Sequence, residues 1–144
     1  MEYRYAGRLS NIRASEIREL LKLTERPEVI SFAGGLPASE LFPIQEIKAV
    51  NDYVLDCCGE QALQYTTTEG FQPLRRWIAE RMNSRLGTAF DEDNIMITHG
   101  SQQALDLTGK VFLEEGDVVL CESPTYLAAI SAFRAYGCRF AEVE

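Results

Sequence analysis

Small and polar residues separate an apolar run from an amphipathic segment in the second half of the chain. The run Ile95-Met96-Ile97 is followed by Thr98-His99-Gly100-Ser101-Gln102. At such a helix start the first backbone N–H groups have no partner within the helix, and a hydroxyl and an amide stand beside them. Gly100, Ser101 and Gln102 therefore predict a phosphate seat. The alternative is a simple helix start with Ser101 as N-cap, which stabilises a helix by about 1 kcal/mol.

An aromatic residue follows the next predicted strand. Tyr126 comes directly after Ser123-Pro124-Thr125, in a strand-to-helix turn where proline fixes the backbone. A ring at this place is positioned to stack on a planar cofactor whose phosphate occupies the seat. The alternative is a half-buried ring that covers the helix end.

An alternating framework of strands and helices must position these residues. Short apolar runs at residues 94–98, 117–121 and 138–143 predict buried strands, with amphipathic helices between them, the second over residues 125–136. This alternation is typical of an α/β sheet with parallel strands. Because no helix follows the last strand to cover the sheet, we expect an incomplete domain.

Three further helices are expected upstream. An amphipathic pattern covers residues 10–23, and a second helix with one apolar stripe runs from Pro43 to Gly59. A third runs from Gly70 to Gly87, where the glycine is placed to end it. Its apolar residues, at helical spacing, predict a core face: Leu74, Trp77, Ile78, Met82 and Leu86.

Composition excludes several classes of protein. The 144 residues are 46% hydrophobic, enough for a sizeable core, and carry a formal net charge of −8. This acidity, without any basic block, argues against nucleic acid and membranes as partners. No segment has the ~20 apolar residues of a membrane span, and residues 1–5 lack the apolar core of a signal peptide. We therefore expect a cytoplasmic protein.

The cysteines do not predict a metal site. Cys57, Cys58, Cys121 and Cys138 form no C-x-x-C pair, and the chain has a single histidine. We expect the cysteines to be small buried residues.

Two upstream segments complete a pattern together with the seat and Tyr126. They are Ser31-Phe32-Ala33-Gly34-Gly35-Leu36-Pro37 and, at residues 64–75, Gln-Tyr-Thr-Thr-Thr-Glu-Gly-Phe-Gln-Pro-Leu-Arg. With these motifs in this order and spacing, the chain resembles the start of a fold-type I, pyridoxal-phosphate-dependent aminotransferase. Within that family it resembles especially the 2-aminoadipate and aromatic aminotransferases.

The resemblance implies a fold and a domain organisation. The expected fold is α/β: a large domain of three layers, with helices on both faces of a mainly parallel sheet (αβα), preceded by an N-terminal helical arm. Residues 1–42 would hold the arm and a segment of the small domain. Residues 43–144 would form the first, incomplete part of the large cofactor-binding domain.

The resemblance also implies cofactor contacts. Gly100, Ser101 and Gln102 hold the phosphate of pyridoxal 5'-phosphate, and Tyr126 stacks on its pyridine ring. In the family the tyrosine at the place of Tyr65 reaches the phosphate of the neighbouring subunit's cofactor. Tyr65 therefore implies a homodimer with shared active sites; the alternative is an ordinary loop tyrosine.

Substrate contacts are implied in the N-terminal part. Gly34 and Gly35 let backbone N–H groups approach the α-carboxylate of the substrate, because a Cβ would block it; a plain turn with φ > 0 is the alternative. Arg18, in the predicted arm helix, pairs either with an acidic substrate side chain or with a glutamate on its own helix.

No catalytic residue is expected within the chain. Lys22, Lys48 and Lys110 fall in predicted helices rather than in the family's cofactor loop, and His99 is interpreted as structural. The Schiff-base lysine and its partners are expected beyond residue 144.

We therefore interpret the chain as the N-terminal portion of an aminotransferase, inactive by itself. The complete enzyme would transfer an amino group between an amino acid and a 2-oxo acid. Two alternatives stay open: the aminotransferase-like module of certain transcription regulators, and a non-catalytic binding or assembly fragment.

Overall fold

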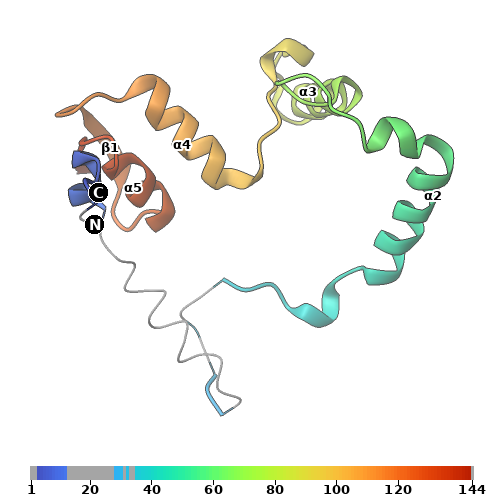
Figure 1. Ribbon diagram of the computed structural model, residues 1–144, viewed down its shortest axis with the longest axis horizontal. Helices are drawn as coiled ribbons and strands as arrows, with labels where there is room; N and C mark the ends of the chain where they lie inside the picture. Colours follow the sequence, from blue (N-terminus) through green and yellow to red (C-terminus); the bar gives the residue numbers. More distant parts are fainter. Residues whose placement is uncertain (1–2, 13–27, 31, 33–34, 144) are drawn as a thin grey trace. The chain divides into compact units, whose positions relative to one another are not determined.

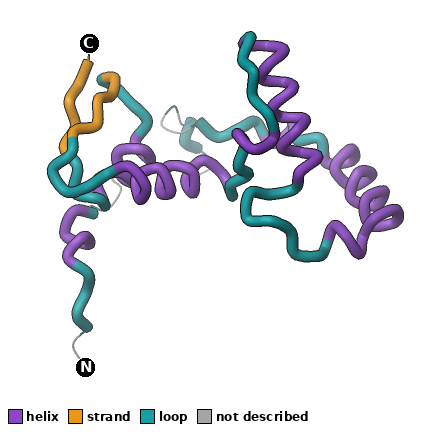
Figure 2. Tube along the Cα trace, turned by 90° about the horizontal axis from the view of Figure 1, so that it is seen from above, coloured by secondary structure: helices purple, strands orange, loops and turns teal. Residues whose placement is uncertain are grey.

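The chain divides into two compact units. The computed structural model describes residues 3–12, 28–30, 32 and 35–143. One unit combines Met1–Ala14 with Gln72–Glu144, and the other is Ser15–Phe71. Figures 1 and 2 show the elements of both units. This division does not decide the domain boundary predicted between residues 42 and 43, which stays a prediction.

A parallel β-α-β arrangement closes the first unit. The strand β1 (Val118–Glu122) leads into α5 (Leu127–Arg134) and then into β2 (Arg139–Val143). The two strands, orange in Figure 2, pair in parallel with Val118 opposite Arg139. The strands predicted at 117–121 and 138–143 and the helix between them are thus confirmed, with ends shifted by one or two residues.

The third predicted strand does not form in the described part of the chain. Residues 95–98 run between η3 (Glu92–Asn94) and α4 (Gly100–Phe112). The backbone at Ile95 is extended, with φ −116° and ψ 129°, yet the sheet contains only β1 and β2. A strand requires a partner that completes its hydrogen-bond ladder, and an apolar sequence does not provide one. The prediction of three strands is therefore wrong for the described residues.

A glycine allows α4 to pack closely against the end of α5. Gly109 is buried in α4, and a Cβ built there would lie 2.7 Å from Cδ2 and Cε2 of Tyr136. The Tyr136 hydroxyl donates a hydrogen bond to Asp106 Oδ1 at 2.9 Å. Desolvation and this hydrogen bond raise the pKa of Tyr136. The contact fixes α4, whose first turn is the predicted phosphate seat.

The N-terminal segment lies beside the residues that follow α5. The 3-10 helix η1 (Gly7–Asn11), blue in Figure 1, shares a hollow of about 370 Å³ with Glu115 and residues 135–137. Ile12, which follows η1, is extended with φ −92° and ψ 120°. The α-helix predicted over residues 10–23 is therefore wrong at its start, and residues 13–23 lie outside the described residues.

The helix α3 (Gln72–Leu86) ends where predicted, because Gly87 has φ +68° and carries no Cβ to oppose that conformation.

The prediction that the apolar face of α3 lies in a core is wrong. Three members of that face are exposed: Leu74, Trp77 and Leu86. The buried residues of α3 are Ala79 and Arg75, which forms an ion pair with Asp93. The apolar face of α3 has no covering element among the described residues.

The second unit contains η2 (Ser39–Leu41) and the long helix α2 (Ile44–Ala62). The helix begins after Pro43 as predicted, but the predicted end at Gly59 is wrong. It continues to Ala62 and is interrupted instead at Cys58, where φ is −152° and ψ 29°. A glycine inside a helix costs only about 1 kcal/mol, so Gly59 need not end it.

Few side chains are buried in the part of the chain that the structure describes. The buried hydrophobic residues are Ala79, Ala132 and Cys138. The expected sizeable core is therefore absent from these residues, because their large apolar side chains lack covering elements. The expectation of buried cysteines is wrong for Cys57 and Cys58, which are exposed. No described helix combines the length and apolarity that crossing a membrane requires.

Candidate phosphate site

The phosphate seat begins with an unusual backbone conformation. His99 is the N-cap of α4, and Gly100 opens the helix with φ +75°. This left-handed conformation costs an L-residue with a side chain roughly 1–2 kcal/mol. A Cβ at Gly100 would meet nothing within 4 Å, so conformation rather than space requires glycine. The alternative that Ser101 is the N-cap is wrong.

Two side chains hold this turn in place. Gln103 Oε1 accepts a hydrogen bond from the His99 backbone N–H at 2.6 Å. Thr98 Oγ1 donates to the Gly100 carbonyl at 3.2 Å, and the Gly100 N–H donates to the Thr98 carbonyl at 3.0 Å. Sequence analysis missed both side chains. The hydrogen bond of Gln103 spans four positions, one more than in a capping box, so the only signal for it was a glutamine within the first helical turn.

The donors of the seat remain available for a ligand. The N–H groups of Ser101 and Gln102 lie in the first turn of α4, where the helix supplies no acceptor. Neither Ser101 Oγ nor the Gln102 amide has a hydrogen-bond partner among the described residues, and both residues are exposed. The first turn contains no acidic side chain, and the helix dipole is positive at this end. The seat therefore fits a dianionic phosphate.

Tyr126 is fixed by its backbone while its ring is accessible. It is the N-cap of α5, and its carbonyl accepts hydrogen bonds from Ala129 and Ile130 at 3.1 and 3.3 Å. The residue is 63% exposed, which argues against the alternative of a ring that covers the helix end. No described hydrogen bond joins Tyr126 to the phosphate seat, so stacking on a cofactor stays a prediction.

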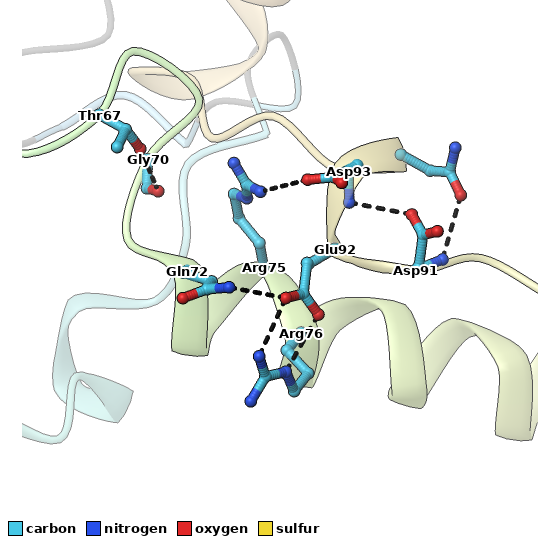
Figure 3. Close-up of polar contacts among 9 residues, drawn as sticks. Thr67, Gly70, Gln72, Arg75, Arg76, Asp91, Glu92 and Asp93 are labelled. Atoms are coloured by element: carbon cyan, nitrogen blue, oxygen red, sulfur yellow. Dashed lines mark hydrogen bonds and ion pairs between the residues drawn. The ribbon is translucent and has the colours of Figure 1, made fainter.

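The remaining predicted residues belong to the other compact unit. Tyr65 is 98% exposed, and its backbone N–H donates to Gln64 Oε1 at 2.8 Å. The turn that follows is closed by Thr67 Oγ1, which donates to the Gly70 carbonyl at 3.1 Å (Figure 3).

The predicted substrate residues are only partly described. Gly35 has no positive φ, so the alternative of a turn with φ > 0 is wrong for it, and a Cβ there would meet nothing within 4 Å. Gly34 and Arg18 lie outside the described residues. The described part of the chain contains no group of three or more His, Cys, Asp or Glu side chains that could hold a metal ion.

An ion-pair network that sequence analysis missed joins α3 to η3, the element that precedes the seat (Figure 3). Arg76 donates from Nε to Glu92 Oε2 at 3.0 Å and from Nη2 to Oε1 at 2.9 Å. Gln72 Nε2 donates to the same Oε1 at 2.7 Å. These hydrogen bonds, with that from Arg76 first, lower the pKa of Glu92 from 4.5 to about 2.

A second ion pair lies beside it. The buried Arg75 donates from Nη2 to Asp93 Oδ1 at 3.0 Å. A capping box closes η3, because the Asp91 side chain accepts from the Asp93 N–H and Asn94 Oδ1 accepts from the Asp91 N–H. The spacing of Asp91 and Asn94 was the signal for this turn. Together the two ion pairs fix the start of the segment that leads into the seat.

Comparison with known proteins identifies the family of the chain. The family described as Aminotransferase class I and II matches residues 27–144. The chain belongs to the class I and II aminotransferases. It is 55% identical over 138 residues to the 2-aminoadipate transaminase of Thermus thermophilus, covering 96% of this chain and 32% of that protein. It is 50% identical over 139 residues to aromatic-amino-acid aminotransferase 1 of Thermococcus litoralis, covering 96% and 33%.

A solved aminotransferase structure has the same fold. The alpha-aminoadipate aminotransferase of Thermus thermophilus, complexed with N-(5'-phosphopyridoxyl)-L-leucine, matches with a TM-score of 0.80 and 49% identity. The match covers 96% of this chain and 33% of that one. The predicted resemblance and the fold-type I fold are thus confirmed, and the transcription-regulator alternative is not favoured. This aminotransferase chain spans about a third of the length of these relatives.

Proposed function

We propose that the intact protein is a pyridoxal-phosphate-dependent aminotransferase that transfers an amino group between an amino acid and a 2-oxo acid. The observation that supports the proposal most strongly is the geometry of the first turn of α4, where Gly100 has φ +75°. The hydrogen-bond donors of Ser101 and Gln102 in this turn have no described partner, and the turn contains no acidic side chain. Membership of the class I and II aminotransferases supports the reaction class. The phosphopyridoxyl compound bound to the related Thermus enzyme supports the cofactor.

In this proposal the chain supplies the binding of the cofactor. The backbone N–H groups of Ser101 and Gln102 and the Ser101 hydroxyl donate to the phosphate oxygens, and the α4 dipole adds a favourable field. Tyr126 packs its exposed ring on the face of the cofactor and limits its tilt. When bound, pyridoxal phosphate withdraws electrons from the substrate Cα and makes its proton acidic.

The chain also contributes to substrate binding and assembly. The open space where a Cβ of Gly35 would stand lets its backbone N–H approach the substrate α-carboxylate. Arg18 pairs with the acidic side chain of a substrate, in line with the 2-aminoadipate named for one relative. The exposed Tyr65 reaches the phosphate bound by a second subunit, so the enzyme is a two-fold homodimer.

A single-turnover experiment tests this function. The intact, cofactor-loaded protein is mixed with one amino acid at a time, from acidic, aromatic and aliphatic classes, without a 2-oxo acid. We expect one equivalent of 2-oxo acid per bound cofactor from at least one class, and return of the amino group when a different 2-oxo acid is added. Release of no 2-oxo acid from any class would contradict the proposal.

A further inference from the structure

Two adjacent cysteines of α2 lie outside the candidate cofactor site and have their thiols in contact. Cys57 and Cys58 are exposed and free, and Cys57 Sγ donates a hydrogen bond to Cys58 Sγ at 3.4 Å. Neighbouring side chains on a regular helix do not face each other. The thiols meet because Cys58 leaves the helical conformation, with φ −152° and ψ 29°. The interruption of α2 therefore creates a preformed dithiol.

The geometry of this dithiol favours a shared bridging atom over a direct sulfur–sulfur bond. Adjacent Cα atoms are about 3.8 Å apart across a trans peptide, below the roughly 4.4–6.8 Å that disulfides usually span. A single centre bonded to both sulfurs at about 2.3 Å, with an angle of roughly 90–110° between the two bonds, would instead hold them about 3.3–3.8 Å apart. The observed 3.4 Å is close to that separation. Thiolates prefer soft centres as partners.

The number of side chains that could coordinate a bound atom beside Cys57 and Cys58 limits which species this dithiol can hold. No group of three or more His, Cys, Asp or Glu side chains able to hold a metal occurs among the described residues, whereas a structural zinc ion takes four ligands. A trivalent arsenic that carries one organic substituent needs only two thiolates. The thiols also border a hollow of about 520 Å³ lined by residues 55–61, where the exposed, apolar Leu55 stands beside the space for the substituent.

We propose that Cys57 and Cys58 form a bidentate site for a thiophilic, monosubstituted trivalent arsenical. In the reaction with the dihydroxy form of such a compound, two As–S bonds form and two As–O bonds break. Each thiol proton leaves with a hydroxide as water. Neither arsenic nor sulfur changes oxidation state.

Hydrated phenylarsine oxide is the probe for this site. The intact protein is treated with one equivalent and digested with trypsin, which releases residues 49–75 as a peptide whose only cysteines are Cys57 and Cys58. We expect this peptide to carry one phenylarsenic group and to lose both free thiols. A dithiol reagent should remove the group, whereas a monothiol at equal thiol concentration should not.

Single substitutions test the chelation. Cys57→Ser or Cys58→Ser should weaken binding by about 100-fold or more, because each removes the second, intramolecular bond. Cys121→Ser, which leaves the pair intact, is the matched control and should bind as the parent protein does. Unchanged affinity in either single variant would overturn the proposal. So would an unmodified 49–75 peptide from the parent protein, or one that is two hydrogens lighter, the product of a disulfide.

Discussion

Gly109 of α4 lies directly against the ring of Tyr136: a Cβ at Gly109 would fall 2.7 Å from two of its carbons. Carbon atoms in favourable contact are about 3.5–4.0 Å apart, so no side chain fits without movement. Tyr136 is also tied to Asp106 by its hydroxyl, which restricts how far the ring can turn. The pair thus sets how closely α4 approaches the end of α5.

The substitution Gly109→Ala is therefore expected to destabilise the intact protein by about 1–3 kcal/mol, as overpacking does elsewhere. Gly59→Ala is the matched control, because a Cβ at Gly59 would lie 3.9 Å from Leu55 Cδ2, an ordinary contact. In α2 this change should be neutral or stabilise by up to about 1 kcal/mol through helix propensity. Denaturant unfolding measures the free energy of unfolding of both variants. Equal changes in the two would contradict the close packing of Gly109 against Tyr136.

The network around Glu92 predicts sensitivity to acid. Hydrogen bonds from Arg76 and Gln72 lower the pKa of Glu92 from 4.5 to about 2. Because the folded state binds this proton less readily than the unfolded state, the interaction stabilises the fold above pH 4.5. The contribution is lost as the pH falls toward the folded value of about 2.

We expect Glu92→Gln to lower stability at neutral pH and to flatten the loss of stability on acidification. Urea midpoints measured across this pH range provide the test, with Glu114→Gln as a control that leaves the network intact. If the Glu92→Gln profile ran parallel to that of the unsubstituted protein at every pH, the assigned ion pair would be wrong.

A substitution at Gly35 is expected to change substrate binding without changing the stability of the fold. A Cβ at Gly35 would meet nothing within 4 Å and its φ is not positive. We expect Gly35→Ala to leave the unfolding midpoint unchanged while raising the KM for the amino acid, since the added methyl occupies the approach of the α-carboxylate. Steady-state kinetics beside thermal unfolding measure the two. A lowered midpoint with unchanged KM would show a structural role instead.

The exposure of Tyr65 predicts a cofactor site that is shared between two subunits. The residue is 98% exposed, so its hydroxyl is available to a second subunit. We expect Tyr65→Phe to weaken cofactor binding by about tenfold, the equivalent of one charge-assisted hydrogen bond, while the dimer persists in sedimentation. Tyr53→Phe, on the same unit, is the control. A fully active monomer, or unchanged cofactor affinity in Tyr65→Phe, would remove the shared site.

Local signals in the sequence predicted much of this structure. Gly87 ends α3 because its conformation is decided within a few residues, and the βαβ pattern around β1 follows from hydrophobic spacing and turn residues. The phosphate seat is local in the same way: Gly100 and the first turn of α4 need no distant partner to form.

Features that depend on distant partners were not predicted. Residues 95–98 lack a strand to pair with, and the apolar face of α3 lacks a cover among the described residues. Arg75 forms its ion pair with Asp93, 18 positions away, and hydrophobic periodicity does not reveal such a pair. The break at Cys58 is likewise invisible in residue types that suit a continuous helix.

The phosphate seat is the central claim, and cofactor affinity tests it most directly. Ser101→Ala removes one donor from the seat without touching Gly100, and Ser84→Ala removes an exposed hydroxyl from α3 as the matched control. The dissociation constant of pyridoxal phosphate is measured for the intact protein and both variants. We expect Ser101→Ala to raise it by roughly 10-fold or more, as the loss of about 1.5–3 kcal/mol implies, and Ser84→Ala to leave it unchanged. Equal constants for Ser101→Ala and the unsubstituted protein would contradict the account.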